Sequence, residues 1–192
     1  MIDVVSLDRV AAQPWRNAGG FTRELLAWPS ADAWHLRASV ADITRDGDFS
    51  RFDGIDRWFA VIHGAGVVLR FPAQRAALDV DSAPFHFDGA AAPYAELLDG
   101  ATRDLNLMIR RDAGNGGMQR ALPDDEWISA APLRALFVTQ PARLQIDDAD
   151  AARLPAGSLA WSAHAARQRW RVQSDDDALV AHWLWFKPAD QT

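Results

Sequence analysis

The sequence predicts an all-β protein made of two jelly-roll barrels. Three observations support this fold class: short segments alternate apolar and polar residues, glycine-marked turns join neighbouring segments, and the same order of segments occurs twice. Helical signals are weak, because no long amphipathic run occurs and the alanines at 90–92 are followed directly by Pro93.

The clearest strand signals lie in the first half of the chain. Residues 34–41 alternate apolar and other side chains over most of their length, which is the period of a strand with two unlike faces. Within residues 58–71, two apolar runs flank a turn that contains Gly64 and Gly66, and this pattern predicts a hairpin. Residues 104–110 begin with the same alternation.

An internal repeat follows from the order of these segments. In the first half a hairpin, a proline-marked short strand and a closing strand pair occur at residues 58–71, 78–87 and 94–111. The second half offers the same order, with its own predicted hairpin first, at residues 133–146, 152–161 and 169–186. That order suits a jelly-roll barrel, in which paired sheets close over a pocket and leave few free edges.

The connector between the halves is marked by glycine and proline within residues 114–126. We therefore expect an N-terminal barrel at residues 1–113, which holds the ligand pocket. A smaller C-terminal barrel is expected at residues 114–192, packed tightly on the first. Most of the nine tryptophans are expected to fill the barrel cores.

The composition is that of a globular protein whose partners are not nucleic acids. Apolar residues make up 49% and charged residues 24% of the chain, which excludes wholesale disorder. A formal net charge of −6 does not favour binding to phosphate backbones. No run approaches the ~20 apolar residues of a membrane span, and the first residues lack a signal-peptide pattern. We therefore expect a cytoplasmic protein that binds neither nucleic acid nor a membrane.

The sequence offers no obvious catalytic or metal centre. It has no cysteine, which excludes disulfides, thiol catalysis and thiolate metal ligands. Metal-binding barrels of this kind use two histidines one residue apart, whereas even the closest pair here, His164 and His182, is widely spaced. Nucleotide loops and nucleophile elbows are also missing from the sequence. We therefore predict no metal, no cofactor and no catalytic residue.

Three polar clusters remain as candidates for a binding site, and they lie within residues 14–24, 37–52 and 103–106. The candidate ligand-binding residues in them are Asn17, Thr22, Arg23, Glu24, Arg37, Ser39, Phe49, Ser50, Arg51, Asp104 and Asn106. Each cluster alone is equally typical of a solvated outer sheet face. Together they supply the charged and neutral groups that a pocket for a small polar carboxylate or amide needs.

These same stretches resemble the HutD/Ves family. The resemblance is carried by motifs at residues 14–24, 37–41, 46–52, 54–57, 84–89, 97–100 and 104–111. It covers about residues 5–111 with specific motifs and the second half only loosely. The sequence departs from the family pattern at Arg16, where a lysine is common, and at Ala18, where a third glycine is common.

The resemblance implies a double cupin, that is, two double-stranded β-helix barrels in one chain (a bicupin). It also implies an association with bacterial histidine utilisation, in which these proteins are thought to bind a pathway intermediate and moderate the pathway. The leading hypothesis is therefore a non-enzymatic protein that binds a small anionic metabolite such as urocanate, formiminoglutamate or formylglutamate. In this hypothesis Arg23, Arg37 or Arg51 pairs with the carboxylate of the ligand.

Two alternatives stay open at this point. One is a metal-independent hydrolase or isomerase acting on a small carboxylate or amide, with Glu24 or Asp104 as general base. The other is a protein-interaction module in which the tryptophans form an interface. The sequence also leaves a homodimer open.

Overall fold

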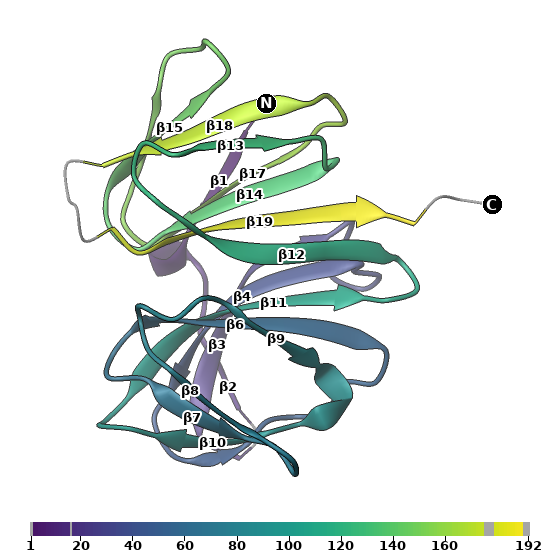
Figure 1. The fold of residues 1–192 in the computed structure, drawn as a ribbon, viewed down its shortest axis with the longest axis vertical. Coiled ribbons are helices and arrows are strands. Elements are labelled where there is room, and N and C mark those ends of the chain that lie inside the picture. The colour runs from purple at the N-terminus through teal and green to yellow at the C-terminus, as the bar shows by residue number, and fades with distance from the viewer. Residues whose placement is uncertain (1, 16, 175–178, 190–192) are drawn as a thin grey trace. The chain divides into compact units, whose positions relative to one another are not determined.

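A computed structural model describes residues 2–15, 17–174 and 179–189 of the 192-residue chain. The described residues confirm the all-β class: they form strands β1 to β19 and two short 3-10 helices, η1 (Leu7–Arg9) and η2 (Gly89–Ala91). They divide into two compact units (Figure 1), one at residues 10–114 and one that joins the chain up to Arg9 to the chain from Asn115 onward.

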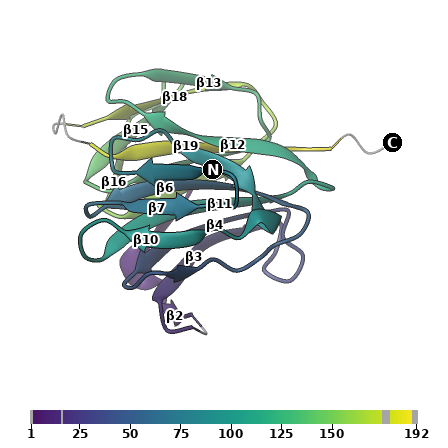
Figure 2. The same cartoon turned by 60° about the horizontal axis from the view of Figure 1, so that its bottom comes forward.

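The unit at residues 10–114 consists of two antiparallel sheets. The larger sheet has the order β2 (Gln13–Pro14), β3 (Gly20–Trp28), β4 (Leu36–Ile43), β11 (Thr102–Arg110), β6 (Ile55–His63) and β9 (Phe85–Asp88). The smaller sheet has the order β5 (Gly47–Asp48), β10 (Tyr94–Leu97), β7 (Val67–Arg70) and β8 (Arg75–Leu78). Strands β7 and β10 lie side by side in both views (Figures 1 and 2).

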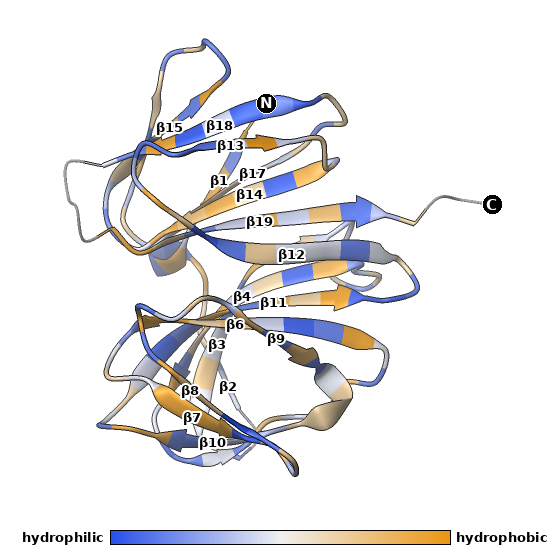
Figure 3. Ribbon diagram, in the orientation of Figure 1, coloured by the Kyte–Doolittle hydropathy of each residue, from blue (hydrophilic) through white to orange (hydrophobic). Residues whose placement is uncertain are grey.

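The core of this unit joins its two sheets. Phe59 and Val61 of β6 pack in one cluster with Val67 and Leu69 of β7, and all four side chains are buried. Burial alternates along the first half of β6, whereas all residues of β14 (Leu133–Val138) are buried; Figure 3 shows the hydropathy along both strands. This alternation places one set of side chains between the sheets, as expected for a sandwich-like barrel.

The other unit is built in the same way. Its larger sheet has the order β1 (Asp3–Ser6), β17 (Ser158–Ala163), β14, β19 (Ala181–Pro188) and β12 (Gly114–Ala121). Its smaller sheet has the order β13 (Glu126–Ser129), β18 (Gln168–Gln173), β15 (Ala142–Ile146) and β16 (Ala152–Leu154). Trp170 and Trp183 are buried in its core, with Trp127 packed against them.

The internal repeat is visible in the strand pairings. The eight strands β4 to β11 match β12 to β19 in chain order: the pairs β4–β11, β11–β6 and β6–β9 correspond to β12–β19, β19–β14 and β14–β17. The smaller sheets agree as well, because β5–β10–β7–β8 corresponds to β13–β18–β15–β16. Eight strands with this pairing form the jelly roll of a cupin, so the double-cupin fold is confirmed.

Both predicted hairpins were wrong in their pairing. Residues 58–71 contribute β6 to one sheet and β7 to the other, and residues 133–146 divide between sheets in the same way at β14 and β15. The turn that contains Gly64 and Gly66 instead leads the chain from one sheet to the other, at a corner of the barrel. Gly66 has a φ of +107°, and a Cβ there would lie 2.2 Å from the carbonyl oxygen of Leu78, so this corner requires glycine.

The division of the chain differs from the expected one at the N-terminus. The expected boundary after residue 113 lies next to the observed division, but the residues up to Arg9, which we had placed with the first barrel, belong to the other unit. The reason is backbone pairing: β1 runs antiparallel to β17, with Val4 opposite Ala160. The backbone N–H of Leu7 also donates to the carbonyl of Gly157 at 2.8 Å. Strand β1 has four residues, too few for its alternation to be recognised in the sequence.

Strands outside the repeat distinguish the two barrels. In the unit at residues 10–114, the long strand β3 continues the larger sheet beyond β4. In the other unit β12, the counterpart of β4, is the last strand of its sheet among the described residues. Strand β3 therefore adds a row of side chains to the first barrel. Separately, no helix in the described residues has the length and hydropathy needed to cross a membrane.

Candidate functional site

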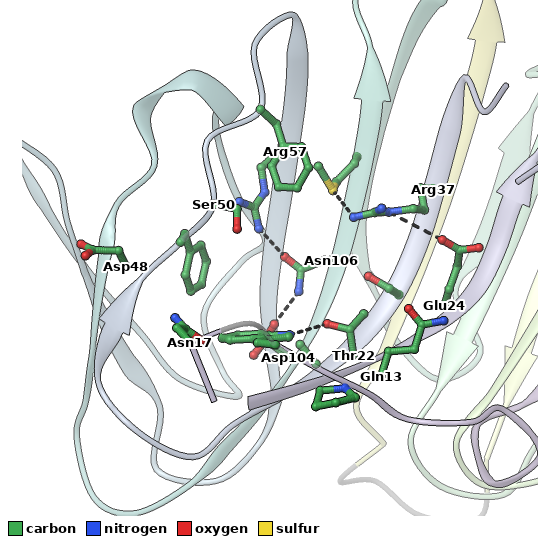
Figure 4. A pocket seen from close by; sticks show the side chains of 17 residues that line it. Gln13, Asn17, Thr22, Glu24, Arg37, Asp48, Ser50, Arg57, Asp104 and Asn106 are labelled. Atoms are coloured by element: carbon green, nitrogen blue, oxygen red, sulfur yellow. Dashed lines mark hydrogen bonds and ion pairs between the residues drawn. The ribbon is translucent and has the colours of Figure 1, made fainter. Parts of the chain in front are cut away.

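A cavity of about 620 Å³ lies within the unit at residues 10–114. Strands β3, β4, β11 and β6 supply one wall, the segment around residues 48–52 supplies another, and the hairpin at residues 13–17 adds a third (Figure 4). Its volume falls in the range of small-molecule sites.

The register of the sheet aligns polar side chains in rows across the cavity wall. Ser39 of β4 lies opposite both Glu24 of β3 and Asn106 of β11, which makes one row. The next row along the strands contains Thr22, Ala41 and Asp104. Because alternate residues of a strand share a face, Asp104 and Asn106 both point into the cavity, as the sequence pattern predicts.

Arg57, Asn106 and Asp104 form a hydrogen-bonded chain in this wall (Figure 4). Nη2 of Arg57 donates to Oδ1 of Asn106 at 3.0 Å, and Nδ2 of Asn106 donates to Oδ2 of Asp104. A guanidinium can only donate, so it fixes the amide oxygen toward Arg57 and leaves the amide N–H groups for the carboxyl. All three residues are buried, and Asp104 is 0% exposed.

Arg57 is a buried cation enclosed by aromatic rings. Its Cζ lies 5.0 Å from the ring centroid of Phe49, 5.7 Å from that of Phe52 and 5.1 Å from that of Phe87. The negative faces of these rings attract the guanidinium. Burial lowers the pKa of Arg57 to about 10, and the charge of Asp104 opposes that shift, so Arg57 stays protonated near neutral pH.

A second guanidinium, Arg37, lies beside the first. Its Nη2 lies 3.1 Å from the sulfur of Met108, and its Nε lies 3.9 Å from Oε2 of Glu24. Its Cζ is 5.8 Å from the ring centroid of Phe52, so Phe52 contacts both arginines. Burial lowers the pKa of Arg37, and Glu24 opposes this shift.

Several buried polar atoms at the cavity make no hydrogen bond to any residue in the described ranges. They are Nε and Nη1 of Arg57, Nε of Arg37 and Oδ1 of Asp104. Buried donors and acceptors are almost always paired, so such atoms need an explanation. Gathered at one cavity, they indicate groups that are available to a bound molecule.

Asp104 is the most perturbed carboxyl of the site. Complete burial raises its pKa well above the ordinary value, because the ionised form loses its hydration. The hydrogen bond from Asn106 and the charge of Arg57 oppose this shift, while the nearby charge of Asp42 adds to it. Its carboxyl therefore holds its proton to a higher pH than an exposed carboxyl does.

The hairpin that precedes β3 fixes the edge of the cavity. The indole N–H of Trp15 donates to the hydroxyl of Thr22 at 2.7 Å. A Cβ at Gly20 would lie 2.2 Å from the carbonyl oxygen of Asp42, so this position requires glycine. Ala18 has a φ of +54°, a left-handed conformation that explains why the HutD/Ves pattern commonly has glycine there. Arg16 lies outside the described residues.

The cavity brings together every predicted ligand-binding residue except two arginines. Those that line it are Asn17, Thr22, Glu24, Arg37, Ser39, Phe49, Ser50, Asp104 and Asn106. Whether they bind a ligand remains a prediction.

Arg23 and Arg51 do not line the cavity. On β3, Arg23 alternates with inward-pointing neighbours, so its own side chain points to the other face of the sheet. Arg51 lies in the segment between β5 and β6, outside any strand, and its side chain turns to solvent. Arg23 instead pairs with Asp42 at 2.7 Å, and Arg51, whose side chain is 66% exposed, pairs with Asp53 at 2.7 Å.

Arg57 is the main residue that sequence reasoning missed. Our predicted strand began at Trp58, so Arg57 fell outside it, whereas β6 begins at Ile55. An arginine two residues before the core residue Phe59 lies on the core face of its strand, and that spacing was the available signal. Other lining residues outside our prediction are Gln13, Pro14, Trp15, Ala41, Asp48, Phe52 and Met108.

The donors at the cavity are unlike those of a metal site. No histidine lines it. Among the residues that the structure describes, no three His, Cys, Asp or Glu side chains gather closely enough to hold a metal ion. Guanidinium, amide and hydroxyl groups suit an organic acid better than a cation.

Sequence comparisons relate the chain to one family. The family model HutD matches residues 8–180. The protein Ves of Citrobacter koseri is 38% identical over 100 residues, which cover 51% of this chain and 52% of Ves. An uncharacterized 21.2 kDa protein in the hutC 3′ region of Pseudomonas putida is 39% identical over 99 residues, covering 50% and 51%. The chain thus spans about half the length of the curated relatives it matches.

A structural comparison covers the whole fold. The structure of HutD from Pseudomonas fluorescens SBW25 superposes with a TM-score of 0.86 at 23% sequence identity, covering 98% of this chain and 100% of that one. At this identity the likeness shows the shared double-barrel fold. The family itself is shown by the sequence model, which extends over most of both barrels. The chain therefore belongs to the HutD family.

Proposed function

We propose that this protein is a non-enzymatic binding protein that holds a small anionic metabolite in the cavity at residues 10–114. One observation carries the proposal: Arg57 is a buried cation with two nitrogen atoms, Nε and Nη1, that have no hydrogen-bond partner among the residues the structure describes. Among the described residues its hydrogen-bonded neighbour is an amide, Asn106, and no carboxylate forms an ion pair with it.

The energetics favour an anion at this position. An uncompensated buried charge is costly, since ions lose hydration on burial. Aromatic faces offset only part of that cost for Arg57, at about 0.5–2 kcal/mol per contact. A carboxylate beside Nη1 or beside Nε would accept a charge-assisted hydrogen bond worth about 1.5–3 kcal/mol.

Arg37 extends the same receptor. Its Nε is also without a hydrogen bond, and its guanidinium shares the ring of Phe52 with that of Arg57. A small acid therefore meets two cations on one side of the cavity. Ser39 and Thr22, on neighbouring rows, supply hydroxyl groups that orient the rest of the ligand.

Family membership supports a place in bacterial histidine utilisation. The chain belongs to the HutD family, and one relative is encoded in the hutC 3′ region of Pseudomonas putida. We propose that the ligand is an anionic intermediate of that pathway, namely urocanate, formiminoglutamate or formylglutamate, and that binding it moderates the pathway.

Calorimetric titration with these three acids tests the proposal. At least one acid should bind, and Arg57→Met, which keeps the side-chain stem but removes the cation, should weaken it by about tenfold to a hundredfold. Arg51→Met is the matched control, because Arg51 is exposed and pairs with Asp53 away from the cavity. It should change the affinity less than about twofold. Binding of none of the acids, or equal binding by Arg57→Met, would contradict the proposal.

A metal-independent enzyme is the second candidate, and the environment of Asp104 favours it. A buried carboxyl with a raised pKa is suited to proton transfer near neutral pH. Glu24 lines the same cavity and is the other candidate base. NMR spectra of each bound acid, recorded over hours with stoichiometric protein, separate the two functions. New product signals that disappear in Asp104→Asn or in Glu24→Gln would establish catalysis, and unchanged spectra support binding alone.

A further inference from the structure

Asp104 lies at the opposite end of the hydrogen-bonded chain from Arg57. Its Oδ2 accepts from Asn106, while its Oδ1 is buried and has no hydrogen-bond partner within the described part of the chain. Asp104 and Asn106 are two residues apart on β11, so their side chains emerge about 7 Å apart along the strand. The cavity therefore presents unpaired donors at one end and an unpaired acceptor further along.

We propose that Asp104 is a second recognition point, which accepts a hydrogen bond from an N–H group at the far end of the bound acid. The cavity would thereby select short acids that carry an amide, amidine or imidazole N–H in addition to the carboxylate. This inference rests on the proposed binding of an acid at Arg57 and adds the chemistry of the other end of the ligand.

The protein itself leaves this acceptor in need of a donor. The amide of Asn106 is fixed by Arg57 and gives Asp104 one hydrogen bond. In the same row, Ala41 has no polar side chain, and the hydroxyl oxygen of Thr22 already accepts from the indole of Trp15. Buried carboxylates with ordinary or low pKa values accept two or three hydrogen bonds, whereas the carboxyl of Asp104 accepts one from the described residues.

The charge of the cavity leads to the same ligand class. Its ionisable lining residues are Glu24, Arg37, Asp48, Arg57 and Asp104. Among the described lining residues Asp104 thus shares the cavity with two further carboxyl groups, those of Glu24 and Asp48, and a ligand carboxylate adds to their repulsion. An N–H donor directed at Asp104 offsets the repulsion and keeps its carboxyl ionised in spite of burial.

Matched pairs of acids test the inference by calorimetry. Urocanate is compared with its furan analogue furylacrylate, which has the same shape and carboxylate but no N–H. N-formylglutamate is compared with glutarate, which lacks the amide. In the pair that binds, the N–H acid should be about tenfold tighter, as expected for a hydrogen bond to a buried charged acceptor.

Two variants locate the effect. Asp104→Asn turns an NH₂ group toward the ligand, because the amide oxygen is needed by Asn106, so the preference for the N–H acid should vanish or reverse. Asp48→Asn removes the same charge from the same cavity at an exposed position, so both acids should bind more tightly with their ratio preserved. Each variant is first checked for folding by thermal melting.

The outcomes distinguish this inference from the proposed function. If both acids of a pair bind the unmodified protein equally and depend on Arg57, acid binding stands and the role of Asp104 is refuted. That comparison needs no variant, so it remains decisive even if Asp104→Asn does not fold. If none of the acids binds, the proposed function and this inference both fall.

Discussion

Arg57 and Asp104 are connected through the amide of Asn106, which accepts a hydrogen bond from the guanidinium and donates one to the carboxyl. The two charges come from different strands, β6 and β11, and both are buried. An amide between them fixes both side chains while leaving other donors of Arg57 and one oxygen of Asp104 unpaired. The arrangement sacrifices some stability for a preorganised site.

Loss of the connecting amide should destabilise the protein strongly. Asn106→Ala removes both hydrogen bonds and leaves Arg57 and Asp104 buried with fewer partners, so the free energy of unfolding should fall by about 2–4 kcal/mol. Urea denaturation measures this change. Ser39→Ala is the control, because Ser39 is buried opposite Asn106 but takes no part in the Arg57–Asn106–Asp104 hydrogen bonds. It should lower the free energy of unfolding by less than about 1 kcal/mol. An equal decrease in the free energy of unfolding in the two variants would refute the stabilising role of the Asn106 hydrogen bonds.

Asp104 should make stability depend on pH. Burial raises the pKa of Asp104 in the folded state, so the folded protein binds more protons than the unfolded chain between the two pKa values. The contribution of Asp104 to stability is therefore full below its unfolded pKa of about 3.9 and is lost as pH rises through the folded pKa. Asp42 acts oppositely, because its lowered pKa adds stability that is lost in acid.

Asp104→Asn isolates this effect. The variant should be more stable than the parent at pH 8, and the difference should shrink as pH approaches 4, because the amide cannot ionise. Urea denaturation of both proteins from pH 4 to pH 8 gives the difference between their free energies of unfolding. The other charged groups nearby are present in both proteins, so their contributions largely cancel; they are Asp42, Glu24, Asp48, Arg37 and Arg57. A difference that stays constant with pH would mean that the pKa of Asp104 is not raised.

Phe52 should affect ligand affinity through both arginines. Its ring lies under the guanidiniums of Arg37 and Arg57, so Phe52→Leu removes two cation–π contacts while keeping an apolar side chain. The affinity for the bound acid should fall about three- to tenfold as the arginines lose orientation. Phe137→Leu is the control, because Phe137 is a buried phenylalanine of β14 in the other unit and contacts neither arginine. Calorimetry that shows equal affinities for both variants would contradict this role.

Much of this architecture could be predicted from the sequence, because alternation and repetition are local signals. The class, the repeat and the cavity residues on β4 and β11 follow from the two-residue period, as Arg37 with Ser39 and Asp104 with Asn106 show. Pairing could not be predicted: the turn at Gly64 and Gly66 is identical in appearance to a hairpin turn, although it leads from one sheet to the other.

The errors at the site have a similar origin. Arg23 and Arg51 were selected for their charge, yet Arg23 alternates with inward-pointing neighbours on β3 and Arg51 lies exposed between β5 and β6. Arg57 was overlooked because a charged residue was taken as the end of an apolar strand. A buried arginine is tolerated there through contacts with Phe87 and Asn106, which lie far from it in sequence, and with Phe49 of the preceding segment. Such contacts are invisible to local pattern reasoning.

The second buried arginine, Arg134, should serve stability and not binding. It is 0% exposed, and its Nη1 and Nη2 donate to three backbone carbonyls, those of Ser129, Ala166 and His164. Arg134→Met would leave these carbonyls unpaired and should lower the free energy of unfolding by about 3–5 kcal/mol.

The contrast with Arg57 makes this prediction specific. In the described residues, Nε and Nη1 of Arg57 are unpaired at a cavity, whereas both terminal nitrogens of Arg134 donate to main-chain carbonyls within its own unit and its Nε alone is unpaired. Arg57→Met should therefore lose ligand affinity at a smaller cost in stability, and Arg134→Met should lose stability while its folded fraction binds the acid within about twofold of the parent. Urea denaturation and calorimetry on both variants measure the two quantities. A loss of affinity in folded Arg134→Met would show that Arg134 contributes to binding and would overturn the assignment.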